Sequence, residues 1–351
     1  MEYQIKQLWI KNFKSVKDLK IECSKINLLI GEPNVGKSNI LEALSFYGCS
    51  YNRNHEKFMS DFIRYESFVD LFYDHNISDR ISFISNLGSI FINYNYEKAI
   101  FKLQNIESEY VDTIVSENEL KNSNKVIDTV EIRENGLSVF NYKTFSLSNA
   151  KKYKFTSTSI DNTNDGLSLF PPYGSNLFRT IQTHAELREE IANLLEANGL
   201  RLQLNTVQKS IEIVKIKGNV SYTLPYIALA DTLRRIIFYY AAIMSNKESI
   251  LLFEEPESHF FPPYIRDLAF KIIDDAENQY FIATHSPQLF NTLVEKTPKE
   301  DLAVFATYYE NDETKIHKME EEELSELLDY GVNVFSNLSK YTHENRTANI
   351  G

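Results

Sequence analysis

Apolar and polar positions in the first fifty residues follow two different periods. Residues 5–10 and 19–21 alternate apolar and polar side chains on either side of a short turn, which predicts an antiparallel pair of strands. Residues 26–30 form a short, mainly apolar run that predicts a buried strand. Residues 38–48 then carry apolar side chains at helical spacing, with Gly48 as the predicted C-cap. Strand, loop and helix are therefore expected in direct succession.

The C-terminal half repeats the order of buried strand and helix. Residues 249–253 and 279–283 are apolar runs that predict two further buried strands. Such strands, joined through amphipathic helices, favour an α/β fold with a mixed, largely parallel sheet. The other predicted elements are helices over residues 177–197 and 229–244, a helix opening at Pro262 and Pro263, and a strand over residues 211–216 that ends at a Gly218-Asn219 turn.

The region between these halves differs in composition. Residues 52–164 are rich in Asn, Ser, Tyr, Phe and Ile and contain short alternating runs, which predict an inserted mixed β region. A chain of 351 residues allows two domains, or one domain with a large insertion, at about 150 residues per domain. We predict core halves 1–51 and 219–310, an inserted β-rich and helical region 52–218, and a C-terminal tail 311–351.

Composition and charge exclude several classes of protein. Lys and Arg number 37 against 49 Asp and Glu, giving a net charge of −12, which argues against attachment to nucleic acid by bulk charge and leaves only a local basic stripe open. The two cysteines cannot form a disulfide framework. No apolar run approaches the roughly 20 residues that span a membrane, and residues 1–6 lack a signal-peptide pattern. We expect a soluble, cytoplasmic protein without a membrane partner.

One loop carries a specific phosphate-binding pattern. Residues 31–38, GEPNVGKS, match G-x-x-x-x-G-K-[ST] at every fixed position, between a predicted strand and a predicted helix. Such a loop points backbone N–H groups at phosphate oxygens, its lysine reaches the β- and γ-phosphates, and its hydroxyl coordinates Mg²⁺. We therefore predict ATP and Mg²⁺ as cofactors, bound by Gly31, Asn34, Val35, Gly36, Lys37, Ser38 and Asn39.

Two further polar clusters end predicted buried strands. Glu254 and Glu255 follow the strand at residues 249–253, where adjacent carboxylates are costly unless a cation or a network satisfies them. In nucleoside-triphosphate enzymes one such acid serves Mg²⁺ and another polarises the attacking water. His285 lies in Thr-His-Ser-Pro, 30 residues after Glu255, where its ring could bond a γ-phosphate. We assign Glu255, His285 and Lys37 as catalytic, and Ser38 and Glu254 as metal ligands.

Together these motifs resemble the ABC-type ATPases of the structural-maintenance-of-chromosomes (SMC), RecF and OLD-like branch. The opening Ile10-Lys11-Asn12-Phe13-Lys14-Ser15 also resembles that branch, and the likeness covers roughly residues 1–50 and 225–310. It implies an ABC-type P-loop fold with an N-terminal antiparallel β-subdomain. It also implies that Asn12 and Lys14 lie near the nucleotide, that Glu255 is the general base and that His285 is the switch histidine. The family's glutamine loop has no clear counterpart, and Gln104 is a candidate only by elimination.

The same resemblance implies assembly through the nucleotide sites. The family's signature loop contacts ATP bound by the opposite subunit, and the matching stretch here is residues 227–234, with Ala230 in place of serine and Thr232 in place of glycine. We therefore expect a homo-oligomer, dimeric or larger. After His285 only 66 residues remain, too few for the metal-binding Toprim domain of OLD-like nucleases. Residues 52–225 lack the sustained heptads of chromosome-maintenance ATPases.

These features favour a free-standing ATPase that controls a separately encoded effector, a nuclease or toxin, in prokaryotic antiphage defence. A RecF-like ATPase of DNA repair or recombination is a second hypothesis, for which the net charge offers no support. A nucleotide-gated scaffold with little turnover is the third. ATP turnover that DNA stimulates would support the repair ATPase. Absence of ATP turnover would support the scaffold.

Overall fold

The computed structural model of the protein describes residues 3–51, 57–106, 126–139, 147–157, 166–329 and 333–342. The chain divides into two compact units. Unit 1 comprises Met1–Lys152, Glu248–Glu255 and Gln279–Gly351, and unit 2 comprises Tyr153–Lys247 and Pro256–Asn278. These boundaries differ from the predicted division into core halves, insertion and tail. Residues 52–152 of the predicted insertion and the predicted tail belong to unit 1, and residues 153–218 of the insertion belong to unit 2.

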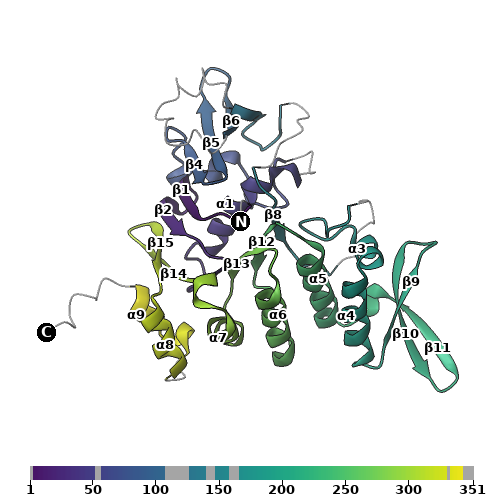
Figure 1. The fold of residues 1–351 in the computed structure, drawn as a ribbon. Coiled ribbons are helices and arrows are strands. Elements are labelled where there is room, and N and C mark those ends of the chain that lie inside the picture. Colours follow the sequence, from purple (N-terminus) through teal and green to yellow (C-terminus); the bar gives the residue numbers. More distant parts are fainter. Residues whose placement is uncertain are drawn as a thin grey trace. The chain divides into compact units, whose positions relative to one another are not determined.

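A six-stranded sheet forms the core of unit 1, with strand order β15-β14-β3-β13-β12-β8 (Figure 1). Strands β14, β3, β13 and β12 run parallel to one another, and β15 is antiparallel to β14. All five residues of β3 and of β13 are buried, as expected for strands covered on both faces. The predicted mixed, largely parallel sheet is confirmed. The strands are β3 (Ile26–Ile30), β8 (Ala150–Tyr153), β12 (Ile250–Glu254), β13 (Gln279–Ala283), β14 (Leu302–Glu310) and β15 (Glu313–Lys318).

A second sheet of unit 1 is entirely antiparallel, in the order β2-β1-β4-β5-β6-β7. Its first two strands are the predicted N-terminal pair, and the other four come from the predicted insertion. The alternating runs of that segment are therefore strands of the same subdomain. The strands are β1 (Gln7–Phe13), β2 (Val16–Glu22), β4 (Ile81–Ser85), β5 (Gly88–Asn95), β6 (Ile100–Ile106) and β7 (Val126–Ile132).

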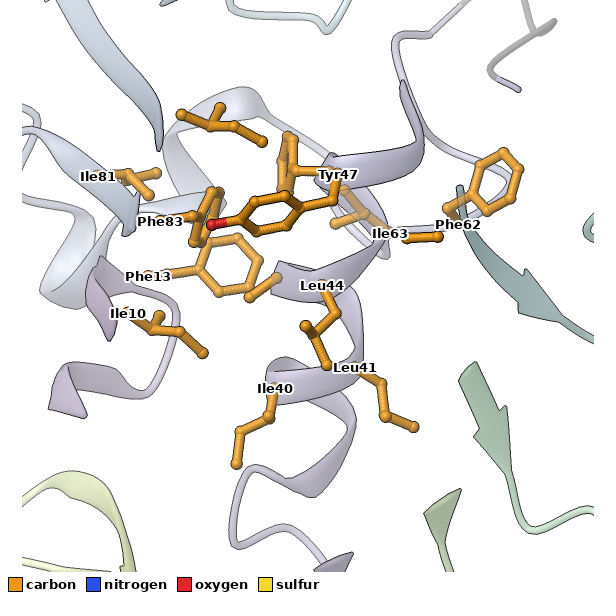
Figure 2. Packing of buried hydrophobic residues seen from close by; sticks show 14 of the residues in the cluster. Ile10, Phe13, Ile40, Leu41, Leu44, Tyr47, Phe62, Ile63, Ile81 and Phe83 are labelled. Atoms are coloured by element: carbon orange, nitrogen blue, oxygen red, sulfur yellow. The ribbon is translucent and has the colours of Figure 1, made fainter. Parts of the chain in front are cut away.

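Helix α1 (Lys37–Ser45) contacts β12 and β13 of the core sheet and β1 of the antiparallel sheet. Figure 2 shows its apolar side chains, among them Ile40 and Leu44, packed with buried residues of the antiparallel sheet. Phe46 stacks on Phe83 with ring centroids 4.9 Å apart. The predicted C-cap at Gly48 is wrong. Phe46 caps α1, and the buried residues that follow continue as a 3₁₀ turn in which Gly48 has φ −106°.

Unit 2 contains four α-helices and a three-stranded antiparallel sheet of order β11-β10-β9 among its described residues. The helix predicted over residues 177–197 is interrupted at His184, whose backbone is extended. The His184 N–H still donates to the Thr180 carbonyl at 3.1 Å, and the Thr183 hydroxyl donates to the Arg179 carbonyl at 2.9 Å. The elements are α3 (Leu177–Thr183), α4 (Ala185–Glu196), β9 (Arg201–Asn205), β10 (Ser210–Lys217), β11 (Val220–Pro225), α5 (Asp231–Ser245) and α6 (Pro262–Asp274).

The C-terminal part of unit 1 adds α7 (Pro287–Lys296), α8 (Glu321–Asp329) and α9 (Ser339–Thr342). The Ser286 side chain caps α7 by accepting the Leu289 N–H. No helix within the described ranges is long and apolar enough to cross a bilayer. Short 3₁₀ helices span Phe46–Tyr51, Phe68–Leu71, Tyr73–His75, Tyr226–Ala228, Lys299–Asp301 and Val334–Ser336.

Candidate nucleotide-binding site

The glycine-rich loop joins the carboxyl end of β3 to the amino end of α1, as the sequence predicts. Gly36 is the N-cap of α1 and has φ 101°, in the left-handed region where residues with a Cβ are strained. Lys37 is buried, and its ammonium donates to the carbonyls of Gly31 at 2.9 Å and Glu32 at 2.7 Å. The lysine thus crosses the loop and holds it closed around the helix N-terminus. This arrangement presents backbone N–H groups to an anion.

The loop is held in place by β14, β15 and the β1–β2 turn. The Thr314 hydroxyl donates to the Val35 carbonyl at 2.9 Å and lies 2.6 Å from the Ser15 hydroxyl. Asn39 donates to the same Ser15 oxygen at 2.7 Å. A Cβ at Gly31 would lie 2.3 Å from the carbonyl oxygen of Thr307, so the loop passes directly over β14. Both glycines are therefore required by their neighbours.

Gly36→Ala is expected to disorder the loop and to abolish nucleotide binding. The new Cβ would lie 2.0 Å from Thr314 Oγ1 and 2.9 Å from Ser15 Oγ. We expect a loss of unfolding free energy of about 2–3 kcal/mol, since strained backbone costs about 1–3 kcal/mol and the clash adds to it. Urea unfolding and nucleotide titration would measure both effects.

Gly199→Ala is the matched control. Gly199 has φ 70°, but a Cβ there would meet nothing within 4 Å, so only the backbone term remains. The difference between the two variants isolates the steric term. Adding Thr314→Ala to Gly36→Ala removes the two closest atoms and should recover part of the stability. Equal stability of the two alanine variants would contradict the clash.

Glu254 ends β12 and faces the loop. One of its carboxylate oxygens accepts a hydrogen bond from the Ser38 hydroxyl, and the other lies 3.3 Å from the ammonium of Lys152. Burial alone would raise the pKa of Glu254. The Lys152 charge, the Ser38 hydrogen bond and the Arg64 charge outweigh that effect and hold the pKa below its usual range. The carboxylate is therefore ionised beside the serine hydroxyl.

Glu255 points to a different partner because the backbone turns sharply at this residue. Its φ is 46°, in the left-handed region, and its N–H donates to the Ala283 carbonyl at 2.8 Å. Its carboxylate lies 3.6 Å from Nε2 of His285. Burial, and then the Lys37 charge, lower the pKa of His285, while Glu255 opposes them. The two adjacent acids thus diverge, one toward Ser38 and one toward His285.

These groups line one cavity of about 520 Å³ within unit 1. Of the predicted site, the cavity brings together Asn34, Gly36, Lys37, Ser38, Asn39, Glu254, Glu255 and His285. Burial lowers the pKa of Lys37 to about 8, although the negative charges of Glu255 and Glu254 act to raise it. The arrangement offers a cation and backbone donors on one side of the cavity and carboxylates on the other.

Four residues of the predicted site do not line this cavity: Gly31 and Val35 of the loop, and Asn12 and Lys14. Three residues outside the predicted set do line it, namely Pro33, Arg64 and Ala283. Asn12 donates to the Arg80 carbonyl at 3.1 Å and does not line the cavity. Lys14 donates to the buried carboxylate of Glu42, which Arg64 also contacts at 2.9 Å. Arg64 itself lines the cavity, so Lys14 is linked to the cavity only through Glu42 and Arg64. No motif in the sequence marks Arg64, because it belongs to the predicted insertion.

The side chains of Ser38 and Glu254 suit Mg²⁺. Carboxylate and hydroxyl oxygens are hard ligands of the kind that this ion takes alongside nucleotide phosphates. The hydrogen bond between the two side chains shows that they are close enough to serve one ion. The residues present therefore fit the predicted metal.

The remaining predicted elements lie elsewhere. Gln104 is buried on β6, within the antiparallel sheet, and does not line the cavity. The predicted signature segment, residues 227–234, leads into α5 of unit 2. Ala230 is exposed at the N-cap and makes no side-chain capping bond, while Asp231 pairs with Arg234 and Arg235 at 3.1 and 2.9 Å. Thr232 donates to the His259 carbonyl at 2.9 Å.

The mixed core sheet, the antiparallel subdomain and the glycine-rich loop give this chain a P-loop fold like that of the ABC-type ATPase heads. Residues 26–291 match a family described as "AAA domain, putative AbiEii toxin, Type IV TA system". The match covers more than half of the chain, and the chain belongs to this family. It is an ATPase.

A curated protein and two solved structures are similar to this chain. A Helicobacter pylori protein named ATP/GTP phosphatase is 22% identical over 340 residues, covering 85% of this chain and 90% of that protein. The SMC head bound to the C-terminal winged-helix domain of ScpA has a similar fold, with a TM-score of 0.54 and 14% identity over 92% of this chain and 99% of that chain. A Pyrococcus furiosus SMC head with an extended coiled coil, bound to the C-terminal domain of ScpA, has a TM-score of 0.51 and 12% identity. The match covers 93% of this chain and 98% of that chain.

Proposed function

We propose that this ATPase assembles through its nucleotide sites and controls a separately encoded effector, a nuclease or toxin, in antiphage defence. The proposal rests on one observation: the predicted nucleotide-binding residues and the predicted signature segment belong to different units. The phosphate loop, acids and histidine share one cavity of unit 1, whereas the signature segment belongs to unit 2 and exposes its helix N-terminus. An exposed helix N-terminus suits a phosphate supplied by a second copy.

Each residue of the cavity has a role in this proposal. Lys37 and the loop N–H groups bind the phosphates. Ser38 and Glu254 hold Mg²⁺, which when bound neutralises charge on the phosphates. Glu255 would accept a proton from the attacking water, and His285, whose Nε2 lies 3.6 Å from the Glu255 carboxylate, would orient that carboxylate and bond the γ-phosphate. The strained backbone at Glu255 supports its assignment as the base, since such strain clusters at functional sites.

The comparisons link this family to toxin–antitoxin systems and its fold to partner-bound ATPase heads. The family description names a toxin of a toxin–antitoxin system, and the similar SMC heads are bound to domains of a partner protein. Phage challenge of bacteria that carry the native gene with its neighbours would test the proposal. We expect phage plating to rise when Lys37→Ala or Glu255→Gln replaces the wild-type gene. Unchanged plating, together with turnover that duplex DNA stimulates, would favour a repair ATPase. Protection that persists without turnover would favour a scaffold.

Ala230→Ser is expected to tighten ATP-dependent association by about tenfold. The new hydroxyl at the N-cap of α5 can bond a γ-phosphate of the facing subunit, and a hydrogen bond to a charged group contributes roughly 1.5–3 kcal/mol. Sedimentation with a non-hydrolysable ATP analogue would measure the change.

The control for this variant separates association from helix capping. Serine at an N-cap stabilises a helix by about 1 kcal/mol whatever the subunits do, so thermal unfolding without nucleotide is measured in parallel. In a Lys37→Ala background, Ala230→Ser should leave association unchanged. Equal association of wild type and Ala230→Ser in the presence of the analogue would place the subunit contact elsewhere.

A further inference from the structure

A fully buried lysine lies behind the metal-site carboxylate. Lys152 is on β8, the strand next to β12 in the core sheet, and its side chain has no exposed surface. Its ammonium lies 3.3 Å from Oε2 of Glu254 and donates to the Phe62 carbonyl at 3.4 Å. The other oxygen of Glu254 accepts the Ser38 hydrogen bond. Burying an ammonium is costly unless an opposite charge compensates it, and Glu254 supplies that charge.

This pairing changes the charge that a metal ion would meet. Glu254 is the carboxylate that accepts the Ser38 hydrogen bond, and its other oxygen is paired with Lys152. Lys152 is not among the residues that line the cavity, so the ammonium lies behind the carboxylate and does not face bound phosphate. A divalent cation at Ser38 and Glu254 would be repelled by a positive charge one side chain away, in surroundings where screening is weak.

We propose that Lys152 is an internal counter-ion that weakens divalent-metal binding at Ser38 and Glu254, so that metal binds tightly only together with nucleotide phosphates. This inference rests on the proposed metal site. The nucleotide then supplies the negative charge that the protein has neutralised. Lys152 acts through Glu254 and is a positioning residue.

Binding of Mn²⁺ to the nucleotide-free protein, followed by electron paramagnetic resonance, tests the inference without measuring turnover. Lys152→Met removes the charge and keeps a side chain of similar length. We expect it to bind Mn²⁺ at least about tenfold more tightly than wild type, because a like charge next to the ion is lost. Lys152→Gln removes the charge but keeps a hydrogen-bond donor, and it should show the same gain if Lys152→Met does not fold.

Two controls match these variants. Lys152→Arg keeps the charge and should bind Mn²⁺ as wild type does. Lys151→Met removes the neighbouring buried lysine of the same strand, which alternation directs to the opposite face, and should also leave Mn²⁺ binding unchanged. Thermal unfolding of each variant checks that the fold is retained.

The outcomes separate this inference from the proposed site. If Lys152→Met and Lys152→Gln bind Mn²⁺ no more tightly than wild type, while Glu254→Gln weakens binding, Lys152 is not a competing charge and the inference is overturned. If adding Glu254→Gln to Lys152→Met removes the gain, the inference holds. If Glu254→Gln changes Mn²⁺ binding in no background, with or without ADP, the proposed metal site itself is wrong.

Discussion

Lys37→Ala is expected to lower the affinity for ATP by about 100-fold or more while the fold is retained. The ammonium lies inside the phosphate loop, bonded only to the Gly31 and Glu32 carbonyls among the hydrogen bonds seen there, and can turn toward phosphate oxygens. Charged hydrogen bonds contribute roughly 1.5–3 kcal/mol each, and each 1.4 kcal/mol corresponds to about tenfold in affinity. Equilibrium titration with a fluorescent ATP analogue would measure the loss.

Loss of packing must be separated from loss of charge in this experiment. Lys37 is largely buried, so truncation to alanine also removes its aliphatic stem from the loop. Lys37→Met restores most of that stem without the charge and should bind ATP as poorly as Lys37→Ala. Normal affinity in a folded Lys37→Met protein would show that the loop binds phosphate without its lysine, against the assignment made here.

Glu255→Gln is expected to slow ATP hydrolysis by about 10²–10⁴-fold and to leave ATP binding intact. The amide cannot accept the proton of the attacking water, and general-base catalysis typically contributes that factor. The amide still fits the space beside His285, because Gln and Glu have nearly the same shape. Steady-state phosphate release and nucleotide titration on the same preparation would give both quantities.

The exposed Glu32 offers a matched control for this change. It belongs to the same loop, but its side chain does not line the cavity, so Glu32→Gln should hydrolyse ATP at the wild-type rate. Glu254→Gln should differ from both, because it contacts Ser38 and should alter the dependence of nucleotide affinity on Mg²⁺. Full turnover in Glu255→Gln, combined with its loss in Glu254→Gln, would reverse the roles assigned to the two acids.

Local patterns predicted the elements that carry the site. β3 and β13 have the predicted bounds, because buried parallel strands are short uninterrupted apolar runs. Helix ends were predicted less well. Periodicity predicted neither the extended backbone at His184 nor the end of α1 at the buried Phe46. The sequence pattern also did not reveal the boundaries of the compact units. These boundaries depend on pairing between strands that are far apart in the sequence, such as β1 and β4.

The sequence by itself determined the phosphate loop, the acid pair and the histidine, because each is a contiguous motif whose chemistry depends on local spacing. Tertiary structure alone decided which residues surround them. Ser38 and Glu254 are 216 positions apart, and Ser15 and Thr314 are 299 apart. Arg64 and Lys152 come from the predicted insertion. The fold places Arg64 in the lining of the cavity and the Lys152 ammonium 3.3 Å from Glu254. Burial gives Lys152 its importance, since an ammonium excluded from water must pair with whatever carboxylate the fold places beside it.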